Sequence, residues 1–393
     1  MGCPRLALGA SGRSGEAALV RKAWLVALFL PGALRAGESA PGERGRRLLG
    51  EALQAERSAG PEGAAEVVKR FRAAAEEAPA WGIAQLDLAV VLDREGDVEG
   101  ATRAYRAALA APGAGEETVR AAAARISALA LLRGDAGAAR LLAHQVAQTF
   151  PAATWPLELR AEVELAAGDA AAAQQAARAA LSRSPKSVRA LCALARAHAG
   201  LGVPGTARLL ALRAAEAAPH DARPHVLLAV LARRRGDPAA ELAALRGATA
   251  SDPRSAEAAL LLGKALHARG LGDEALAEIA RAAELEPRSA SAHLALGALL
   301  AQHKRPARAA EELEQSAKLA PRAPEPHLEL ARLRLDAEQD AGSALAEAQK
   351  FVQLSPAPPP PGHPVYALMQ RSEQALKAAP RAPVVQKTMG DGK

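Results

Sequence analysis

Residues 256–289 read AEAALLLGKALHARGLGDEALAEIARAAELEPRS, and this stretch decides the fold. Gly270 marks a turn near its middle, and Asp273 is expected to cap the helix that follows. That helix is expected to end at Glu286, because the residue before Pro287 avoids helical geometry. Small and apolar residues recur on both sides of the turn at the spacing of one helix face. They are Ala259, Leu262, Gly263 and Leu266, then Ala275, Ile279 and Ala282. The stretch predicts a helix, a turn and a second helix.

The same pattern returns along the chain with a period of 34 residues. Prolines mark the end of each repeat and glycines mark its internal turn. The marks are Pro151, Pro185, Pro219, Pro253, Pro287 and Pro321, with Gly134, Gly168, Gly202, Gly236 and Gly270. A fixed period of this length indicates a solenoid, in which each unit packs only on its neighbours. Two departures stand out, because Lys304 replaces a turn glycine and Glu241 takes a position that is small elsewhere.

This pattern resembles the tetratricopeptide repeat family over residues 48–356, as an array of about eight to nine units. The family's small position in the first helix is Gly263 or Gly297 here, and its small position in the second helix is Ala275 or Ala309. The resemblance implies an all-α fold, a right-handed superhelical solenoid of antiparallel helix pairs. It also implies a protein-protein interaction scaffold or adaptor, which binds peptides or partner proteins on a concave groove.

The N-terminal residues lie outside the repeat. In residues 1–36, Arg21 and Lys22 precede a short apolar run and then small residues, which is typical of a secretory signal peptide. A true translation start near residue 20 would make this pattern more regular. The apolar run is too short to span a membrane. Residues 37–47 read as a linker. The sequence therefore favours a bacterial protein that is periplasmic or secreted. Such a protein would contact the membrane only if this segment is not cleaved. A cytoplasmic or membrane-anchored protein is the alternative.

The C-terminal residues also leave the repeat. Residues 357–363 form a proline-rich linker. Val365, Leu368 and Met369 then favour a short amphipathic helix in residues 364–393, followed by a disordered tail. Such a helix is expected to cap the last repeat, since terminal repeats need a polar outer face.

Composition narrows the range of partners. Only 2% of the 393 residues are aromatic although 50% are hydrophobic, and alanine accounts for much of that difference. Alanine favours closely packed helices, whereas a protein that stacks nucleic-acid bases needs aromatic side chains. The net charge of +7 divides into +4 in residues 1–46 and +3 in residues 357–393, so the array between them is neutral. The sequence therefore argues against a nucleic-acid partner.

No motif for catalysis or for cofactor binding stands out in the sequence. It contains no HExxH zinc motif, and its glycine pairs occur in turns between helices rather than in a nucleotide-binding loop. His225, His293 and His327 occupy equivalent positions in three repeats, which favours a structural role over a shared metal. Cys3 and Cys192 lack metal-ligand spacing. We therefore expect a protein that is not an enzyme and that uses no cofactor and no metal.

Basic residues concentrate at the first-helix positions that contact ligands in the family. They are Arg189, Arg196, Arg223, Arg233, Lys264 and His267. The resemblance thus implies a protein or peptide partner with acidic residues, whose carboxylates would pair with arginine. The family's carboxylate-clamp arrangement is not matched, because Cys192, Val226 and Leu260 stand at the position where it has lysine. An ordinary solvated face, a regulatory repeat protein and an accessory domain of an enzyme are the alternative interpretations.

Overall fold

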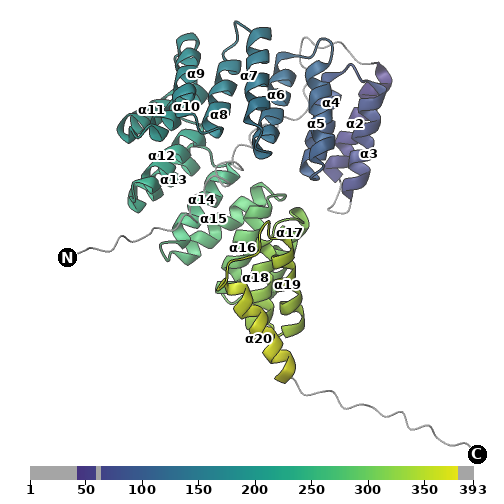
Figure 1. The fold of residues 1–393 in the computed structure, drawn as a ribbon, viewed down its shortest axis with the longest axis vertical. Helices are drawn as coiled ribbons and strands as arrows, with labels where there is room; N and C mark the ends of the chain where they lie inside the picture. The colour runs from purple at the N-terminus through teal and green to yellow at the C-terminus, as the bar shows by residue number, and fades with distance from the viewer. Residues whose placement is uncertain (1–41, 59–62, 379–393) are drawn as a thin grey trace, which may run out of the picture. The chain divides into compact units, whose positions relative to one another are not determined.

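The computed structural model describes residues 42–58 and 63–378, and it contains nineteen helices and no strand within them (Figure 1). The predicted all-α fold is confirmed. The expected signal segment 1–36 lies outside the described residues. The helices are α2 (Glu43–Ser58), α3 (Ala64–Glu77), α4 (Gly82–Arg94), α5 (Val98–Ala110), α6 (Glu116–Leu132), α7 (Ala136–Thr149), α8 (Trp155–Ala166), α9 (Ala170–Arg183), α10 (Val188–Gly200), α11 (Pro204–Ala217), α12 (Ala222–Arg234), α13 (Pro238–Ser251), α14 (Ala256–His267), α15 (Gly272–Leu285), α16 (Ala290–Gln302), α17 (Pro306–Leu319), α18 (Glu325–Asp336), α19 (Ala341–Leu354) and α20 (Pro364–Ala378).

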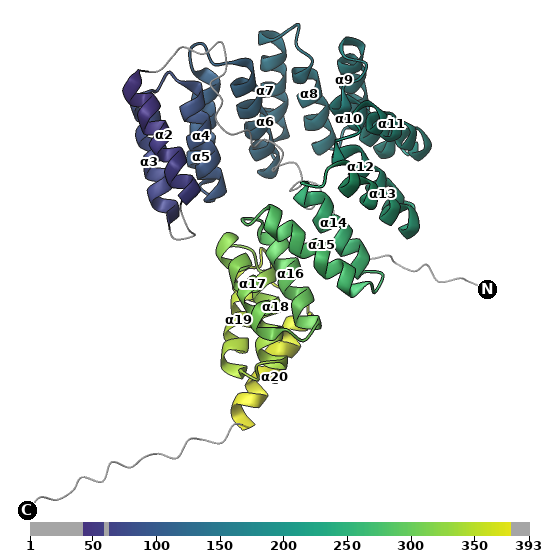
Figure 2. The same ribbon diagram turned by 180° about the vertical axis from the view of Figure 1, so that it is seen from behind.

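The helices belong to two compact units. The first unit ends at Pro219 and holds α2 to α11, and the second begins at His220 and holds α12 to α20. Within each unit, an even-numbered helix packs against the odd-numbered helix after it, as α14 does with α15 (Figure 2). The odd-numbered helix then packs against the next even-numbered one. We call the even-numbered helices first helices and the odd-numbered ones second helices.

Small residues let the paired helices approach closely. A Cβ atom added to Gly263 of α14 would stand 2.4 Å from Cγ1 of Ile279 and 3.1 Å from the carbonyl oxygen of Ala275, both in α15. Gly297 of α16 meets α17 in the same way, with the carbonyl oxygen of Ala309 at 3.0 Å. Ala275 and Ala309 are fully buried. The small positions that recur in the sequence are therefore the places where the two backbones touch.

In the described turns inside helix pairs, one residue takes a left-handed backbone conformation. Six of these residues are glycines with φ between 68° and 85°, a region that glycine adopts without steric penalty. They are Gly96, Gly134, Gly168, Gly202, Gly236 and Gly270. Lys304 takes the same conformation at φ 56° between α16 and α17. The departure at Lys304 thus leaves the form of the turn unchanged.

Aspartates directly after the turn glycine cap four of the second helices. Each accepts a hydrogen bond from the backbone N–H three residues further on. The four are Asp97, Asp135, Asp169 and Asp237. The prediction that Asp273 caps α15 is wrong. Leu271 follows Gly270 and occupies the N-cap without a side-chain hydrogen bond, so Asp273 lies inside the first turn of α15.

The ends of the described residues have their own packing. Helix α2 begins at Glu43, ahead of the residue at which the repeat pattern starts. Helix α20 packs against α19 and buries Val365 and Leu368 beside Phe351. Among the helices of residues 42–58 and 63–378, none combines the length and the hydropathy of a membrane span.

Candidate partner-binding surface

First helices of neighbouring pairs also contact one another inside a unit, for example α8 with α10 and α16 with α18. Positions two, five, nine and twelve of a first helix share one side of it, because they are spaced by three or four residues. We call this side the first-helix face. On α14 it consists of Glu257, Leu260, Lys264 and His267, of which the first three are half-buried and His267 is exposed. All six predicted partner-binding residues lie on this face of α10, α12 or α14.

In the first unit, an internal carboxylate already binds one of the predicted arginines. Arg196 of α10 donates to Oε2 of Glu162 of α8 at 2.5 Å. The second oxygen of Glu162 is buried and has no hydrogen-bond partner among the described residues. Burial raises the pKa of Glu162, and the charges of Arg196 and Arg189 oppose that rise. The structure thus places Arg189 and Arg196 beside an acidic group that the prediction did not include.

In the second unit, both predicted arginines of α12 have carboxylate partners. Arg223 contacts Asp221 through Nε at 2.9 Å and Nη2 at 2.5 Å. Arg233 binds Oε1 of Glu241 through Nε at 2.7 Å. This pair explains why Glu241 departs from the small-residue pattern, since its carboxylate reaches back from α13 to α12. These arginines therefore carry less free positive charge than the sequence suggests.

Lys264 is different from those arginines. No ion pair and no hydrogen bond joins its ammonium group to the residues that the structure describes. It is half-buried, and burial together with the charge of Arg233 lowers the pKa of Lys264. A half-buried cation without an anion is a costly arrangement, which an anionic ligand would relieve.

Two carboxylates occupy the other end of the α14 face, and the prediction missed them. Glu257 lies in the first turn of α14, and Glu286 lies directly after the end of α15. Burial and the nearby charge of Glu286 raise the pKa of Glu257 from 4.5 to about 7, while Arg223 opposes the rise. Burial also raises the pKa of Glu286. The sequence could have indicated Glu257 as a site residue, because it occupies the same repeat position as Arg189 and Arg223.

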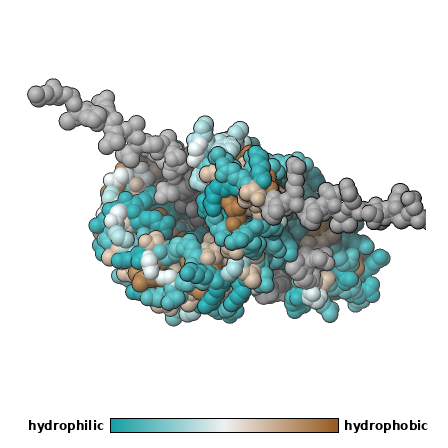
Figure 3. Space-filling model, turned by 90° about the horizontal axis from the view of Figure 1, so that it is seen from below, coloured by the Kyte–Doolittle hydropathy of each residue, from teal (hydrophilic) through white to brown (hydrophobic). Residues whose placement is uncertain are grey.

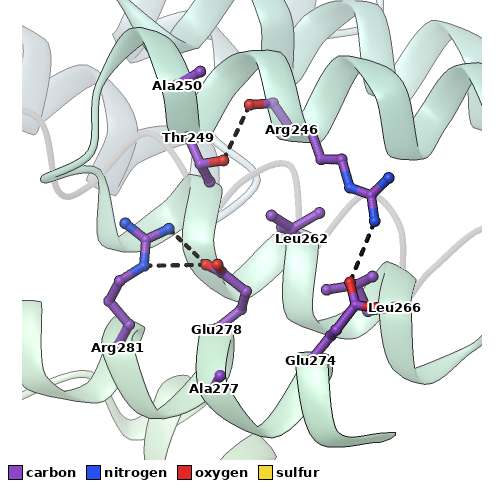
Figure 4. Close-up of a pocket in the computed structure, with 9 residues that line it drawn as sticks. All are labelled: Arg246, Thr249, Ala250, Leu262, Leu266, Glu274, Ala277, Glu278 and Arg281. Atoms are coloured by element: carbon purple, nitrogen blue, oxygen red, sulfur yellow. Dashed lines mark hydrogen bonds and ion pairs between the residues drawn. The ribbon is translucent and has the colours of Figure 1, made fainter. Parts of the chain in front are cut away.

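A separate pocket of about 510 Å³ lies among α13, α14 and α15 (Figure 4). Its lining residues are Arg246, Thr249, Ala250, Leu262, Leu266, Glu274, Ala277, Glu278 and Arg281. Leu262 and Leu266 lie on the side of α14 away from the first-helix face. Figure 4 shows Arg246 paired with Glu274 and Arg281 paired with Glu278, at 3.2 and 2.5 Å. The charged side chains of this pocket are thus paired with one another, unlike the ammonium group of Lys264.

Two of the three histidines singled out by the repeat, His293 and His327, have internal partners. Nδ1 of His293 lies 2.6 Å from Glu312, and Nδ1 of His327 lies 2.6 Å from Glu347. No group of three or more potential metal ligands gathers in the described part of the chain. The face seen in Figure 3 is mostly hydrophilic, with hydrophobic residues in small patches.

Comparison with known proteins finds similarity in fold but no match in sequence. No family model matches the sequence, and the search of curated proteins found no match. Among solved structures, yeast Tom70 aligns over 92% of this chain and 72% of its own, with 15% identity and a TM-score of 0.51. The Cut9–Hcn1 assembly of the APC/C aligns over 84% of this chain, with 14% identity and a TM-score of 0.49. The peptide-binding TPR protein YrrB aligns over 50% of this chain, with 19% identity and a TM-score of 0.33.

These similarities define the class of fold. The chain is an all-helical repeat protein whose structural neighbours are TPR solenoids. It spans 60% of the length of the aligned chain in the Cut9–Hcn1 structure. An array of this kind exposes a long surface made of successive helices.

Proposed function

We propose that this chain is a non-enzymatic scaffold, which binds a segment of a partner protein on the first-helix face of α14 and its neighbours. The observation that carries the proposal is the half-buried ammonium of Lys264, which has no anion among the described residues. Removing a charge from water is unfavourable unless another group compensates it. A carboxylate of the partner would provide that compensation.

The proposal keeps the acidic partner expected from the sequence but assigns its binding to fewer residues. Arg196, Arg223 and Arg233 are each bound by a carboxylate of this chain. The anchor for an acidic residue of the partner is therefore Lys264, with Arg233 beside it and the exposed His267 at the end of the same helix.

Location and pathway are a further part of the proposal. The apolar pattern of residues 1–36 supports export to the periplasm or the medium, where the scaffold would help to assemble a cell-envelope machine. The alternative is a cytoplasmic or membrane-tethered regulator that retains this segment. Mass spectrometry of the protein from its native host separates the two. Cleavage near residue 36 supports export, and an intact N-terminal segment contradicts it.

Photo-cross-linking in the native host tests the scaffold function. A photoreactive phenylalanine analogue replaces Leu260 or Leu294, which are half-buried on the first-helix faces of α14 and α16. Matched controls carry it at Ala277 or Glu284, which are exposed on the second helix α15. We expect the same protein to be cross-linked at both first-helix positions and at neither control. Equal yields at all four positions, or no adduct at Leu260 and Leu294, would contradict the proposal.

A further inference from the structure

The first-helix face of α14 carries opposite charges at its two ends. Glu257 lies in the first turn of the helix, and Lys264 and His267 lie in its last turn. Leu260 stands between them and is half-buried. These residues follow one another at intervals of three, four and three positions, so they share one side of the helix. The face is therefore a strip that runs from acidic through apolar to basic.

Neighbouring helices strengthen this difference between the ends. Glu286 lies close enough to Glu257 for the two charges to interact. Arg223 also faces Glu257, but Asp221 binds its guanidinium. The acidic end thus keeps an excess of negative charge.

At the basic end, Arg233 adds its charge to that of Lys264, and one carboxylate, Glu241, faces the pair. The basic end thus keeps an excess of positive charge. The two ends of the strip therefore differ in sign even after their internal ion pairs are counted.

The helix dipole alone does not explain these residues. The dipole stabilises an acid near the start of a helix and a base near its end, but Glu286 follows the end of α15, where the dipole opposes a negative charge. Glu257, Glu286 and Lys264 are half-buried, and no hydrogen bond or ion pair to the described residues satisfies the side chain of any of them. Their burial therefore leaves three ionisable groups whose charged forms a ligand with opposite charges would stabilise.

We infer that this strip recognises an extended peptide segment with one basic and one acidic residue three positions apart. The inference rests on the proposed scaffold function and specifies its ligand. Seven residues of helix between Glu257 and Lys264 span about 10 Å. Three residues of extended peptide span about the same length. The ligand's cation lies at Glu257 and Glu286, its carboxylate lies at Lys264 and Arg233, and an apolar residue between them packs on Leu260.

Fluorescence anisotropy with labelled peptides and the full chain tests this ligand. The probes are GSKALDSG and its charge-reversed form GSDALKSG, because the direction of the bound peptide is open. Control peptides replace the lysine by glutamine or the aspartate by asparagine. We expect one of the two probes to bind about tenfold more tightly than either of its controls. Failure of both probes to bind, or equal binding of probes and controls, would overturn the inference.

Variants of the chain test which end of the strip recognises each charge of the peptide. In Lys264→Gln, the preference for aspartate over asparagine disappears while the preference for lysine over glutamine remains. In Glu257→Gln the opposite holds, and Glu284→Gln, at an exposed position, changes neither preference. Loss of both preferences in one variant, or retention of both, contradicts the assignment. If Leu260 cross-links to a partner but no peptide discriminates, the scaffold function stands and this ligand is wrong.

Discussion

Replacing Ala275 by phenylalanine is expected to lower the melting temperature of the second unit by about 4–8 °C, or about 2 kcal/mol. Ala275 is fully buried in α15, and its carbonyl oxygen would lie 3.1 Å from a Cβ atom on Gly263 of α14. The two backbones are in contact at this point, so a ring cannot enter without separating the helices. Thermal unfolding followed by circular dichroism measures the effect.

The matched control is Ala277→Phe in the same helix. Ala277 is exposed, so the ring can remain in solvent, and both variants lose the same helix propensity of alanine. We expect its stability to stay within about 0.5 kcal/mol of the parent chain. Equal melting temperatures for the two variants would show that the small-residue register is misplaced.

Replacing Glu257 by glutamine is expected to stabilise the second unit at pH 8 by about 1–2 kcal/mol. The pKa of Glu257 rises from 4.5 to about 7 on folding, so the folded chain holds a proton that the unfolded chain has released. The free energy of unfolding therefore falls as the pH rises from 4.5 to 7, and the full penalty is present above pH 7. The shift corresponds to about 3 kcal/mol, which solvent screening at a half-buried site reduces.

Urea denaturation at pH 8 and pH 5 measures this difference. At pH 5 Glu257 is mostly protonated in the folded chain, so Glu257→Gln should change stability little. Glu284→Gln, at an exposed position of α15, serves as the control and should be neutral at both values. A stabilisation of Glu257→Gln that is the same at pH 5 and pH 8 would mean that the charge of Glu257 is not its cause. A site that is destabilised without its ligand is expected where binding has been favoured over stability.

The repeat could be predicted because its signals are local. The 34-residue period, the turn glycines and the small positions depend only on contacts within one helix pair, and they recur often enough to be recognised. The prediction that Asp273 caps α15 failed because an N-cap depends on the residue at a single position. Leu271 occupies the position that Asp237 holds in the preceding pair. Lys304 shows the reverse case, since the turn keeps its backbone after the glycine is lost.

The charges of the candidate site were harder to predict, because they depend on contacts between helices. The pair of Glu162 with Arg196 joins the same position in adjacent repeats, so the register itself contained that information. The pair of Arg233 with Glu241 depends on how α13 returns along α12, which no period reveals. Glu286 meets Glu257 only because α15 ends beside the start of α14. A prediction limited to the basic residues therefore identified only one of the two charged ends of the candidate site.

Methyl NMR of the full chain during titration with GSKALDSG or GSDALKSG tests most directly whether binding uses the first-helix face. Leucine and valine methyl groups are labelled, and signals are assigned by single Leu→Ile replacements. We predict shifts for Leu260 and for Val230, which lies at the corresponding face of α12, while Leu262 and Leu266 beneath the pocket of Figure 4 stay unchanged. Shifts at Leu262 and Leu266 without shifts at Leu260 would place binding on the other side of α14 and contradict the account.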